Sequence, residues 1–512
     1  MPDRALPDSD ITDPPPVVDG PAPPTLTLEV AIPAGEAARL TRLPLIAPRR
    51  TGRSRGTAES LLWLDTPTGT LAAEGLALEQ SPRGGRTLIR ALPAPGTESH
   101  PGAALETLPI EKLPECAPEA PYVSIAAFEG RRLTFTLDNP GVPTAPLTGT
   151  LRTGKLRAVA AEREVARLTL TGPPDAVLAL IHAIAAELPA LPPIASLAEE
   201  ARALAYGVAI RPRRRGAPDL AKAETVEDAL AQASGHLADA VLAMAPLAHA
   251  GAGPEGVHQM RVGLRRLRSM LKLMRKAADG PAPRALEAGL KTLLGYLGPA
   301  RDWDVFTRGI GAEVASAMPG NRAITQFVEA AEQRRQEAYA ALEDFLASPA
   351  YRAVAWDLAN FAATQAWRAG ASAEALALQA SPLEDFGAHV LARRWKGLAR
   401  DAADMAAMDG ERLHEMRLDA KRLRYAAELF APLFTHRRTR RFQKRLAALQ
   451  ETLGVANDAT VASNLAQSLA NNRAERSFAI GMVTGWAKAK AARNRQDAED
   501  KWTELDAAGP FW

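Results

Sequence analysis

The sequence predicts a protein in two parts, an α+β half followed by an all-α half that contains an internal duplication. Short segments of alternating apolar and polar residues fill positions 25 to about 170, which is typical of strands. From Asp219 onward, apolar residues recur at spacings of three and four, which predicts long helices. Two motifs also recur in this second half at one constant offset of 156 residues. A chain of 512 residues has room for about two to four domains, each with its own core.

The composition excludes several classes of protein. With 47% hydrophobic and 24% charged residues, the chain is neither wholly disordered nor collagen-like. The single cysteine, Cys116, cannot form an internal disulfide, which favours a reducing compartment. The longest apolar stretch, residues 176–186, covers about half of a bilayer. We therefore expect a cytoplasmic protein that makes no membrane contact.

The first half is expected to hold a tail, one domain and a linker. Residues 1–24 contain eight prolines and no apolar signal-peptide core, so we expect a disordered Pro/Asp-rich tail. Residues 25–210 form the predicted α+β domain. Its expected strands include 25–30, 61–65, 131–137 and 165–170, and its expected helices are 173–188 and 194–206. Residues 211–218, rich in Arg and Pro, break the periodicity and predict a linker.

The second half, residues 219–512, is predicted to be a helical bundle of two pseudo-repeats, 219–370 and 371–512. We expect about nine to eleven helices, because Gly and Pro punctuate the pattern near positions 251–254, 280–283, 298–299, 319–320 and 382. The charge is divided unevenly, since residues 1–210 carry a net −5 and the remainder a net +8. The two halves therefore have different electrostatic roles.

The duplication is visible in two separate motifs. Segments 257–270 and 413–426 share six of fourteen residues. The segments L-G-P-A-R-D at 297–302 and L-G-V-A-N-D at 453–458 lie at the same offset. Two matches in one register indicate a pseudo-symmetric pair of bundles.

Each copy of the first motif places bases along one stripe of a helix. The first stripe is His258, Arg261, Arg265, Arg268 and Lys272, and the second is His414, Arg417, Lys421 and Arg424. A parallel apolar stripe accompanies each: Val257, Met260, Leu264, Leu267, Leu271 and Met274 in the first copy, and Leu413, Met416, Ala420 and Leu423 in the second. Like charges at these spacings repel, so we expect an anionic ligand to compensate them. A solvated basic face, or a satisfied core histidine at His258 or His414, is the structural alternative.

Other basic residues complete the candidate site: Arg266 and Arg422 within the motifs, Arg301 of the second motif, and Arg393, Arg394 and Lys396 of a further basic segment that begins at His389. Arginine suits an anion with many phosphate oxygens, because its guanidinium forms bidentate, charge-assisted hydrogen bonds. Two opposed stripes would form a long positive groove that fits a linear polyanion. We expect Asp302, Asp304, Asn457 and Asp458 to cap helices or orient the bases rather than to bind metal. No catalytic residue, metal ligand or cofactor is predicted.

The motifs V-H-Q-M-R-V-G-L-R-R-L-R, L-G-P-A-R-D-W-D-V, L-H-E-M-R-L-D-A-K-R-L-R-Y and L-Q-E-T-L-G-V-A-N-D-A resemble the CHAD family, the conserved-histidine α-helical domain. The resemblance covers about residues 219–512. It implies an internally duplicated helical domain that binds inorganic polyphosphate in a basic channel and is recruited to polyphosphate granules. On the matching positions, that role falls to His258, Arg261, Arg265, Arg268, His414, Arg417, Lys421 and Arg424. Other granule proteins are then expected partners.

The first half resembles a degenerate CYTH domain, the triphosphate tunnel fold that often precedes CHAD domains. The W-L-D-T-P at 63–67 and the G-L-A-L at 75–78 carry this likeness. The family's Glu-x-Glu-x-Lys strand is replaced by T-L-T-L-E at 25–29, and its two later arginines correspond to Glu79 and Ser81. Its late E-x-E strand is matched by Arg167 and Thr169. Because metal-assisted hydrolysis needs several carboxylates, we expect this half to be non-catalytic.

Two alternatives to a polyphosphate binder remain. One is a metal-dependent inorganic triphosphatase, which the missing carboxylates disfavour. The other is a nucleic-acid-binding module, since arginine stripes bind any phosphate backbone. Nucleic-acid readers usually interleave aromatic residues, whereas Tyr425 is the single aromatic residue in the two stripes, so nucleic acid is the less favoured partner.

Overall fold

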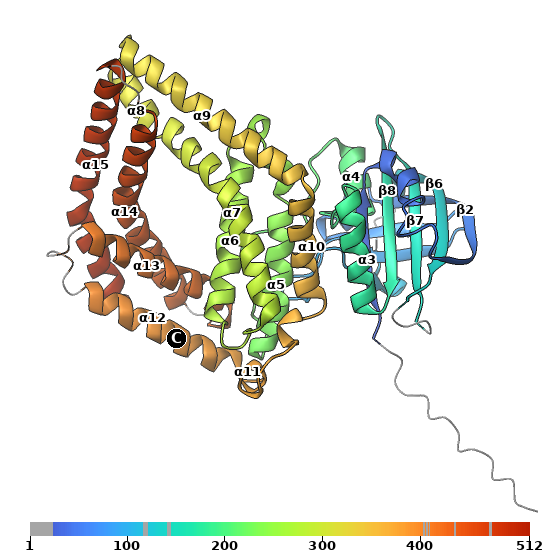
Figure 1. Cartoon of the computed structure of the whole chain (residues 1–512). Coiled ribbons are helices and arrows are strands. Elements are labelled where there is room, and N and C mark those ends of the chain that lie inside the picture. The colour runs from blue at the N-terminus through green and yellow to red at the C-terminus, as the bar shows by residue number, and fades with distance from the viewer. Residues whose placement is uncertain are drawn as a thin grey trace, which may run out of the picture.

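The computed structural model describes residues 24–115, 121–140, 145–402, 405, 408, 410–434, 437–470 and 474–512. It consists of a curled antiparallel sheet with two packed helices, joined to a larger helical region (Figure 1). The predicted tail lies outside the described residues, apart from Pro24.

One eight-stranded sheet forms the first half, in the order β1-β8-β7-β6-β2-β3-β4-β5. The predicted strands are confirmed within β1, β2, β6 and β8, all of which pair antiparallel with their neighbours. The strands are β1 Leu26–Ile32, β2 Arg50–Asp65, β3 Leu76–Gln80, β4 Arg86–Arg90, β5 Thr107–Leu108, β6 Val123–Leu137, β7 Leu147–Arg157 and β8 Glu162–Gly172.

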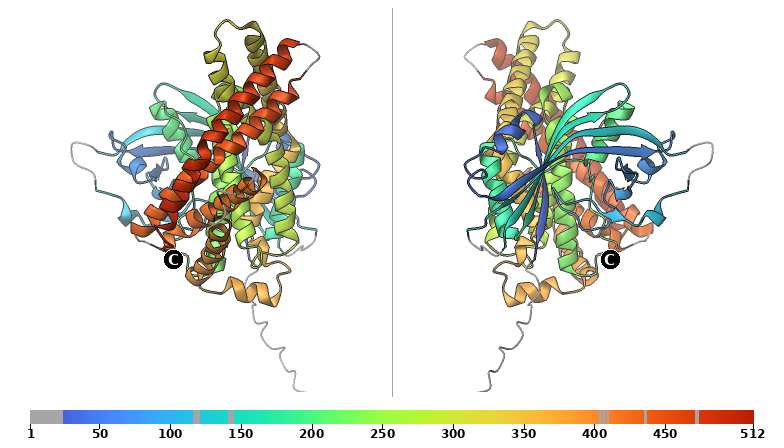
Figure 2. Two further views of the ribbon diagram at one scale, coloured as in Figure 1. Left: turned by 90° about the vertical axis from the view of Figure 1, so that its left-hand side faces the viewer. Right: turned by 90° about the vertical axis from the view of Figure 1, so that its right-hand side faces the viewer.

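The sheet curls until the chain before β5 returns to the free edge of β1 (Figure 2, right). The Glu29 amide donates to the carbonyl of Gly102 at 2.8 Å, and Leu28 pairs with Ala103. Gly102 has a φ of +78°, and a Cβ there would lie 2.9 Å from the Glu29 carbonyl oxygen. This close approach requires glycine, and it shields an edge that would otherwise expose unpaired backbone groups.

The two faces of the sheet are covered by different helices. Alternate residues of β1, Leu28 and Val30 among them, pack with α3 (Pro174–Glu187) in one core. The opposite face packs against α4 (Leu197–Tyr206) through Trp63 and Phe128. Both helices agree with the sequence prediction. Two short helices, α1 Ala37–Leu40 and α2 Thr70–Ala73, complete this half.

The second half contains eleven α-helices among the described residues, within the expected range. They are α5 Val226–Leu242, α6 Glu255–Leu273, α7 Pro281–Arg308, α8 Ile310–Ala317, α9 Arg322–Ala347, α10 Pro349–Ala363, α11 Ala373–Gln379, α12 Leu383–Ala402, α13 Gly410–Phe430, α14 Arg437–Ser468 and α15 Ala474–Asp506. Short 3-10 helices lie at Ala34–Glu36, Ile110–Lys112, Ala245–Leu247, Ala250–Ala252, Ala366–Arg368 and Ala431–Leu433.

One expected helix boundary is wrong, because α7 continues through Gly298 and Pro299. Proline removes one backbone donor and crowds the preceding turn, which commonly ends a helix. Here Leu297, Ala300 and Trp303 are all buried on either side of Pro299. Tertiary packing therefore keeps the helix intact across a residue that disfavours it.

The element order supports the duplication. At the offset of 156 residues, α5, α6, α7 and α9 correspond to α12, α13, α14 and α15. The starts of the two repeats lie together, since the Val226 amide donates to the Ser381 carbonyl and the Leu383 amide to the Glu224 carbonyl. This reciprocal pairing is expected at an approximate twofold axis.

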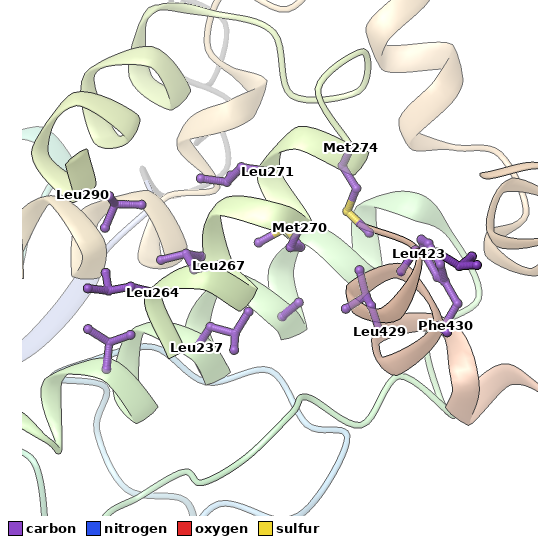
Figure 3. Packing of buried hydrophobic residues seen from close by; sticks show 14 of the residues in the cluster. Leu237, Leu264, Leu267, Met270, Leu271, Met274, Leu290, Leu423, Leu429 and Phe430 are labelled. Carbon is purple, nitrogen blue, oxygen red and sulfur yellow. The ribbon is translucent and has the colours of Figure 1, made fainter. Parts of the chain in front are cut away.

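The motif helices α6 and α13 pack against each other (Figure 3). Met270 of α6 and Met274, which follows its last turn, share one buried cluster with Leu423, Leu429 and Phe430 of α13. The buried apolar stripe of each helix therefore fixes the position of the basic stripe beside it.

The two halves are packed together over a buried interface. Trp356 of α10 donates its indole N–H to the Ala190 carbonyl at 3.0 Å. The predicted linker is irregular, yet Arg213 and Arg214 within it are buried. Arg214 donates to the carbonyls of Ala94 and Thr97, at 2.7 and 2.8 Å. These residues attach the linker to the first half instead of leaving it solvated.

Candidate anion-binding site

A cavity of about 540 Å³ lies between the two repeats, where α6 and α7 face α13, α14 and α15. Its basic lining comes from both repeats: His258, Arg261, Arg265, Arg301, Arg417, Lys421 and Lys490. Three acids, Asp302, Glu313 and Asp458, also line it, together with apolar side chains of α7, α8 and α14. The cationic lining exceeds the acidic one, which favours an anionic occupant.

The apolar stripe of α6 explains why its bases reach this cavity. Every member of that stripe, from Val257 to Met274, is buried, as predicted. His258, Arg261 and Arg265 each follow a member of this stripe by one residue, so they lie on the adjacent face of the helix. All three are half-buried at the cavity wall. In α13, buried Met416 and Ala420 place Arg417 and Lys421 in the same way.

Residues of the second motif, on α7, contact an arginine of the first motif. A Cβ at Gly298 of α7 would lie 3.3 Å from a terminal guanidinium nitrogen of Arg261, so glycine leaves room for this arginine to lie across α7. Arg261 then approaches Asp302 at 3.7 Å, which confirms that Asp302 orients a base. Asp302 and Asp304 both lie well inside α7, so the expectation that they cap helices is wrong.

Asp304 has a structural role away from the cavity. Its buried carboxylate accepts a hydrogen bond from the Tyr339 hydroxyl at 2.8 Å and pairs with Arg335 at 3.4 Å. These contacts join α7 to α9. In the second repeat, Asp458 lines the cavity, and the Asn457 side chain lies outside the described residues.

The crowded cations change the protonation equilibria of the cavity. Burial, followed by the charges of Arg265, Arg417 and Arg261, lowers the pKa of Lys421 to about 8. Burial and the charge of Arg301 lower the pKa of His258 below its ordinary value. Each shift means that the site disfavours its own positive charge, which an anion would relieve.

Several guanidinium groups at this site have unused donors. The Nε atoms of Arg261, Arg265 and Arg417 are buried and have no hydrogen-bond partner among the described residues. Buried donors are normally paired, and these three are available to an acceptor in the cavity, although other arginine Nε atoms of the described residues, such as those of Arg50 and Arg163, are likewise unpaired. A phosphate chain supplies several acceptor oxygens.

Comparison with known proteins agrees with this geometry. The family model for the CHAD domain matches residues 229–467, which contain both motif helices. The crystal structure of the CHAD domain from the plant Ricinus communis is 30% identical, and the match covers 58% of this chain and 98% of that chain at a TM-score of 0.50. The chain belongs to the CHAD family.

A second solved structure is less similar to the chain. PptA from Streptomyces chartreusis is 17% identical at a TM-score of 0.43, over 55% of this chain and 100% of that chain. No curated protein sequence matches the chain. None of the described helices combines the length and apolar character that crossing a bilayer requires.

Only some of the predicted site residues line the CHAD cavity. His258, Arg261, Arg265, Arg301, Arg417 and Lys421 line it. Arg268 leaves the cavity and pairs with Glu287 at 3.5 Å, and Lys272 is exposed beyond it. His414 is exposed and is not among the lining residues, unlike its repeat partner His258.

The other predicted bases lie on neighbouring surfaces of the CHAD domain. Arg266 and Arg424 share the carboxylate of Glu428, at 3.2 and 2.8 Å. Arg422 pairs with Asp419 at 2.6 Å. Arg394 is half-buried near Arg422, while Arg393 and Lys396 are exposed on α12.

One lining cation of the CHAD cavity, Lys490 of α15, is absent from the sequence prediction. Its ammonium pairs with Glu313 of α8 at 2.6 Å. Lys490 lies outside both repeated motifs, in the charged second half of α15. No local pattern distinguishes it, because only the packing of α15 against α8 brings it to the cavity.

Proposed function

We propose that this CHAD protein binds inorganic polyphosphate in the cavity between its repeats, and that this binding recruits it to polyphosphate granules in the cytoplasm. The observation that carries the proposal is the convergence of seven basic side chains from both repeats on one cavity. Three buried guanidinium Nε atoms there have no hydrogen-bond partner among the described residues. A linear polyanion offers acceptors along its whole length, so it can satisfy several of these donors at once. The assignment of the family adds support, because CHAD domains are linked with polyphosphate.

A binding assay with long-chain polyphosphate over a salt series tests this proposal. We expect tight binding that weakens steeply with salt, because each phosphate contact displaces counterions. The variant Arg265→Ala/Arg417→Ala removes one cation from each repeat, and we expect it to weaken binding at least about tenfold, which corresponds to about 1.4 kcal/mol. The variants His258→Ala/Arg265→Ala and His414→Ala/Lys421→Ala then divide the effect between the two stripes.

A matched control removes two exposed arginines of the first half, Arg42→Ala/Arg83→Ala. We expect this control to keep wild-type affinity within about twofold, since its charges are far from the site in sequence and fold. A further variant, Arg393→Ala/Lys396→Ala, determines whether α12 contributes. Equal losses in all variants would contradict a specific cavity, and equal competition by RNA would favour the nucleic-acid alternative.

We also propose that the α+β half acts as a scaffold or partner surface without catalysis. The triphosphate tunnel fold that it resembles implies divalent metal ions, and the residues present do not fit them. On the face of β1 toward α4, the side chains are Thr27, Glu29 and Ala31, so this strand offers one carboxylate where several oxygen ligands are needed. Within the described residues, no group of three or more His, Cys, Asp or Glu side chains could hold a metal.

The one carboxylate of that strand is already engaged. Glu29 lies 3.5 Å from Arg167 of β8, which also contacts Glu200 of α4. Burial raises the pKa of Glu29, and the charge of Arg167 opposes this rise. We expect no phosphate release from tripolyphosphate with Mg²⁺ or Mn²⁺; metal-dependent release that is lost in Glu29→Gln would support the triphosphatase alternative instead.

A further inference from the structure

The start of α14 carries an unusual concentration of positive charge outside the predicted site. Six of its first nine residues are basic: Arg437, Arg438, Arg440, Arg441, Lys444 and Arg445. Buried Thr439, Phe442 and Leu446 anchor the helix, and the first five of these bases are exposed. The cluster is therefore a surface feature held on a rigid element.

This arrangement is costly for an isolated helix. Cations at the amino end of a helix oppose its dipole, and like charges three and four residues apart repel each other. The first turn contains no acidic residue. Within the described part of the chain, Arg437, Arg438, Arg440, Arg441 and Lys444 make no ion pair with a carboxylate. The charge is thus left uncompensated by the protein itself.

The duplicated fold does not require these bases. The corresponding helix of the first repeat is α7, and at the offset of 156 residues its start reads P-A-P-R-A-L-E-A-G. Only Arg284 matches one of the six, Arg440. Because α7 forms with proline, alanine and glycine at the other positions, helix formation does not explain the cluster in α14.

The cluster leads toward the cavity along the seam between α13 and α14, which pack against each other. A second hollow of about 380 Å³ lies on this seam, lined by Arg266, Arg424, Glu428 and Lys444 among others. Arg440 precedes Lys444 by one helical turn, so both lie on one face of α14.

The same seam continues to the main cavity. Arg424 follows the cavity residue Lys421 by three residues on α13, hence on the same helix face. Its guanidinium also donates to the Gln450 side chain of α14 at 3.2 Å. The acid Glu428 is shared between Arg266 and Arg424, so the hollow stays net positive with Lys444. Cations therefore follow one another from the cavity to the end of the α13–α14 hairpin.

From this placement we propose that the basic start of α14 is a second contact surface for polyphosphate, which holds the part of a long chain that extends from the cavity along the α13–α14 seam. The proposal rests on the polyphosphate function proposed above and adds a chain-length preference to it. Short chains occupy the cavity alone, whereas long chains gain the additional contacts of Lys444, Arg440 and Arg441.

The test compares tripolyphosphate with polyphosphate of about one hundred units, using the full-length chain. In the variant Arg440→Ala/Arg441→Ala/Lys444→Ala, we expect long-chain affinity to fall about tenfold or more. The number of counterions released on binding, measured as the slope of log affinity against log salt concentration, should fall by about two. Tripolyphosphate affinity should stay within about twofold. The control Arg42→Ala/Arg83→Ala/Arg86→Ala removes the same charge from the first half, and circular dichroism and thermal melting verify that each variant folds.

The outcomes separate this proposal from the polyphosphate function itself. If wild type binds neither chain length, the proposed function fails. If wild type binds both and the α14 variant binds long chains unchanged, the second contact surface is refuted while the cavity stands. If the α14 variant loses affinity for both chain lengths equally, or the control variant loses as much long-chain affinity, the cluster acts only through the net charge of the protein and the proposal is refuted. If RNA competes with long-chain polyphosphate in wild type but does not compete in the α14 variant, the surface would be assigned to nucleic acid.

Discussion

Lys421 lines the cavity near three arginines, and its protonation should be coupled to ligand binding. Its pKa of about 8 is below its ordinary value of 10.5 because burial and neighbouring cations disfavour the charge. A bound polyanion favours the charged form, so binding raises this pKa and takes up a proton. Affinity for polyphosphate is therefore highest below about pH 8 and declines as the pH rises above that value.

We expect polyphosphate affinity to be about threefold to tenfold weaker at pH 9.5 than at pH 7, measured by fluorescence titration at constant ionic strength. The variant Lys421→Arg keeps its charge over this range and should lose the dependence. An identical pH profile in wild type and Lys421→Arg would show that the titrating group lies elsewhere.

At the same scale, His258 and His414 show how repeated residues can diverge. Both follow the same spacing in their motifs, but only His258 lines the cavity. The lowered pKa of His258 places its protonation below the ordinary value of 6.5, so it can strengthen anion binding only in acidic solution.

At the scale of helices, the contact between α6 and α13 holds the two basic stripes together. Leu423 is fully buried and packs in the cluster that contains Met270 and Met274 (Figure 3). Its truncation would remove this packing and leave a space that the surrounding helices fill incompletely.

We expect Leu423→Ala to lower the free energy of unfolding of the helical domain by about 2–5 kcal/mol, measured by urea denaturation followed by circular dichroism. The control Leu376→Ala changes a leucine that is 42% exposed on α11 and should cost less than about 0.5 kcal/mol. Similar midpoints for both variants would mean that the α6–α13 contact contributes little to stability.

At the scale of the whole molecule, the two halves meet where α5 passes the loop before β5. A Cβ at Gly235 of α5 would lie 1.6 Å from the backbone carbonyl oxygen of Ser99, so this contact requires glycine. The same loop supplies Gly102, which covers the free edge of β1. A shift of this loop would therefore loosen the interface and the sheet edge together.

We expect Gly235→Ala to lower the melting temperature by several degrees and to accelerate proteolytic cleavage near residues 93–103. The control Gly481→Ala places a methyl group in open space on α15, where alanine favours the helix by up to about 1 kcal/mol. A melting temperature of Gly235→Ala equal to that of wild type would refute the close contact.

The sequence by itself determined the α+β and all-α division, the position of four of the eight strands and of the helices α3 and α4, and the duplication. Hydrophobic periodicity and an exact repeat offset depend only on local order along the chain, so they are visible without coordinates. The buried stripe of α6 and the neighbouring basic stripe also follow from helix geometry, and Arg261, Arg265, Arg417 and Lys421 could be named from it.

Tertiary structure alone decided which of these bases share one cavity. Helix periodicity gives the face on which a residue lies, but the crossing of α6 with α13 selects the turns that face each other, so Arg268, Lys272 and His414 are left outside. It also brought Lys490 to the cavity and kept α7 intact through Pro299, since packing between distant segments can outweigh local preference. The physical reason is that motifs encode local geometry, whereas a site between two repeats is formed by contacts between residues more than one hundred positions apart.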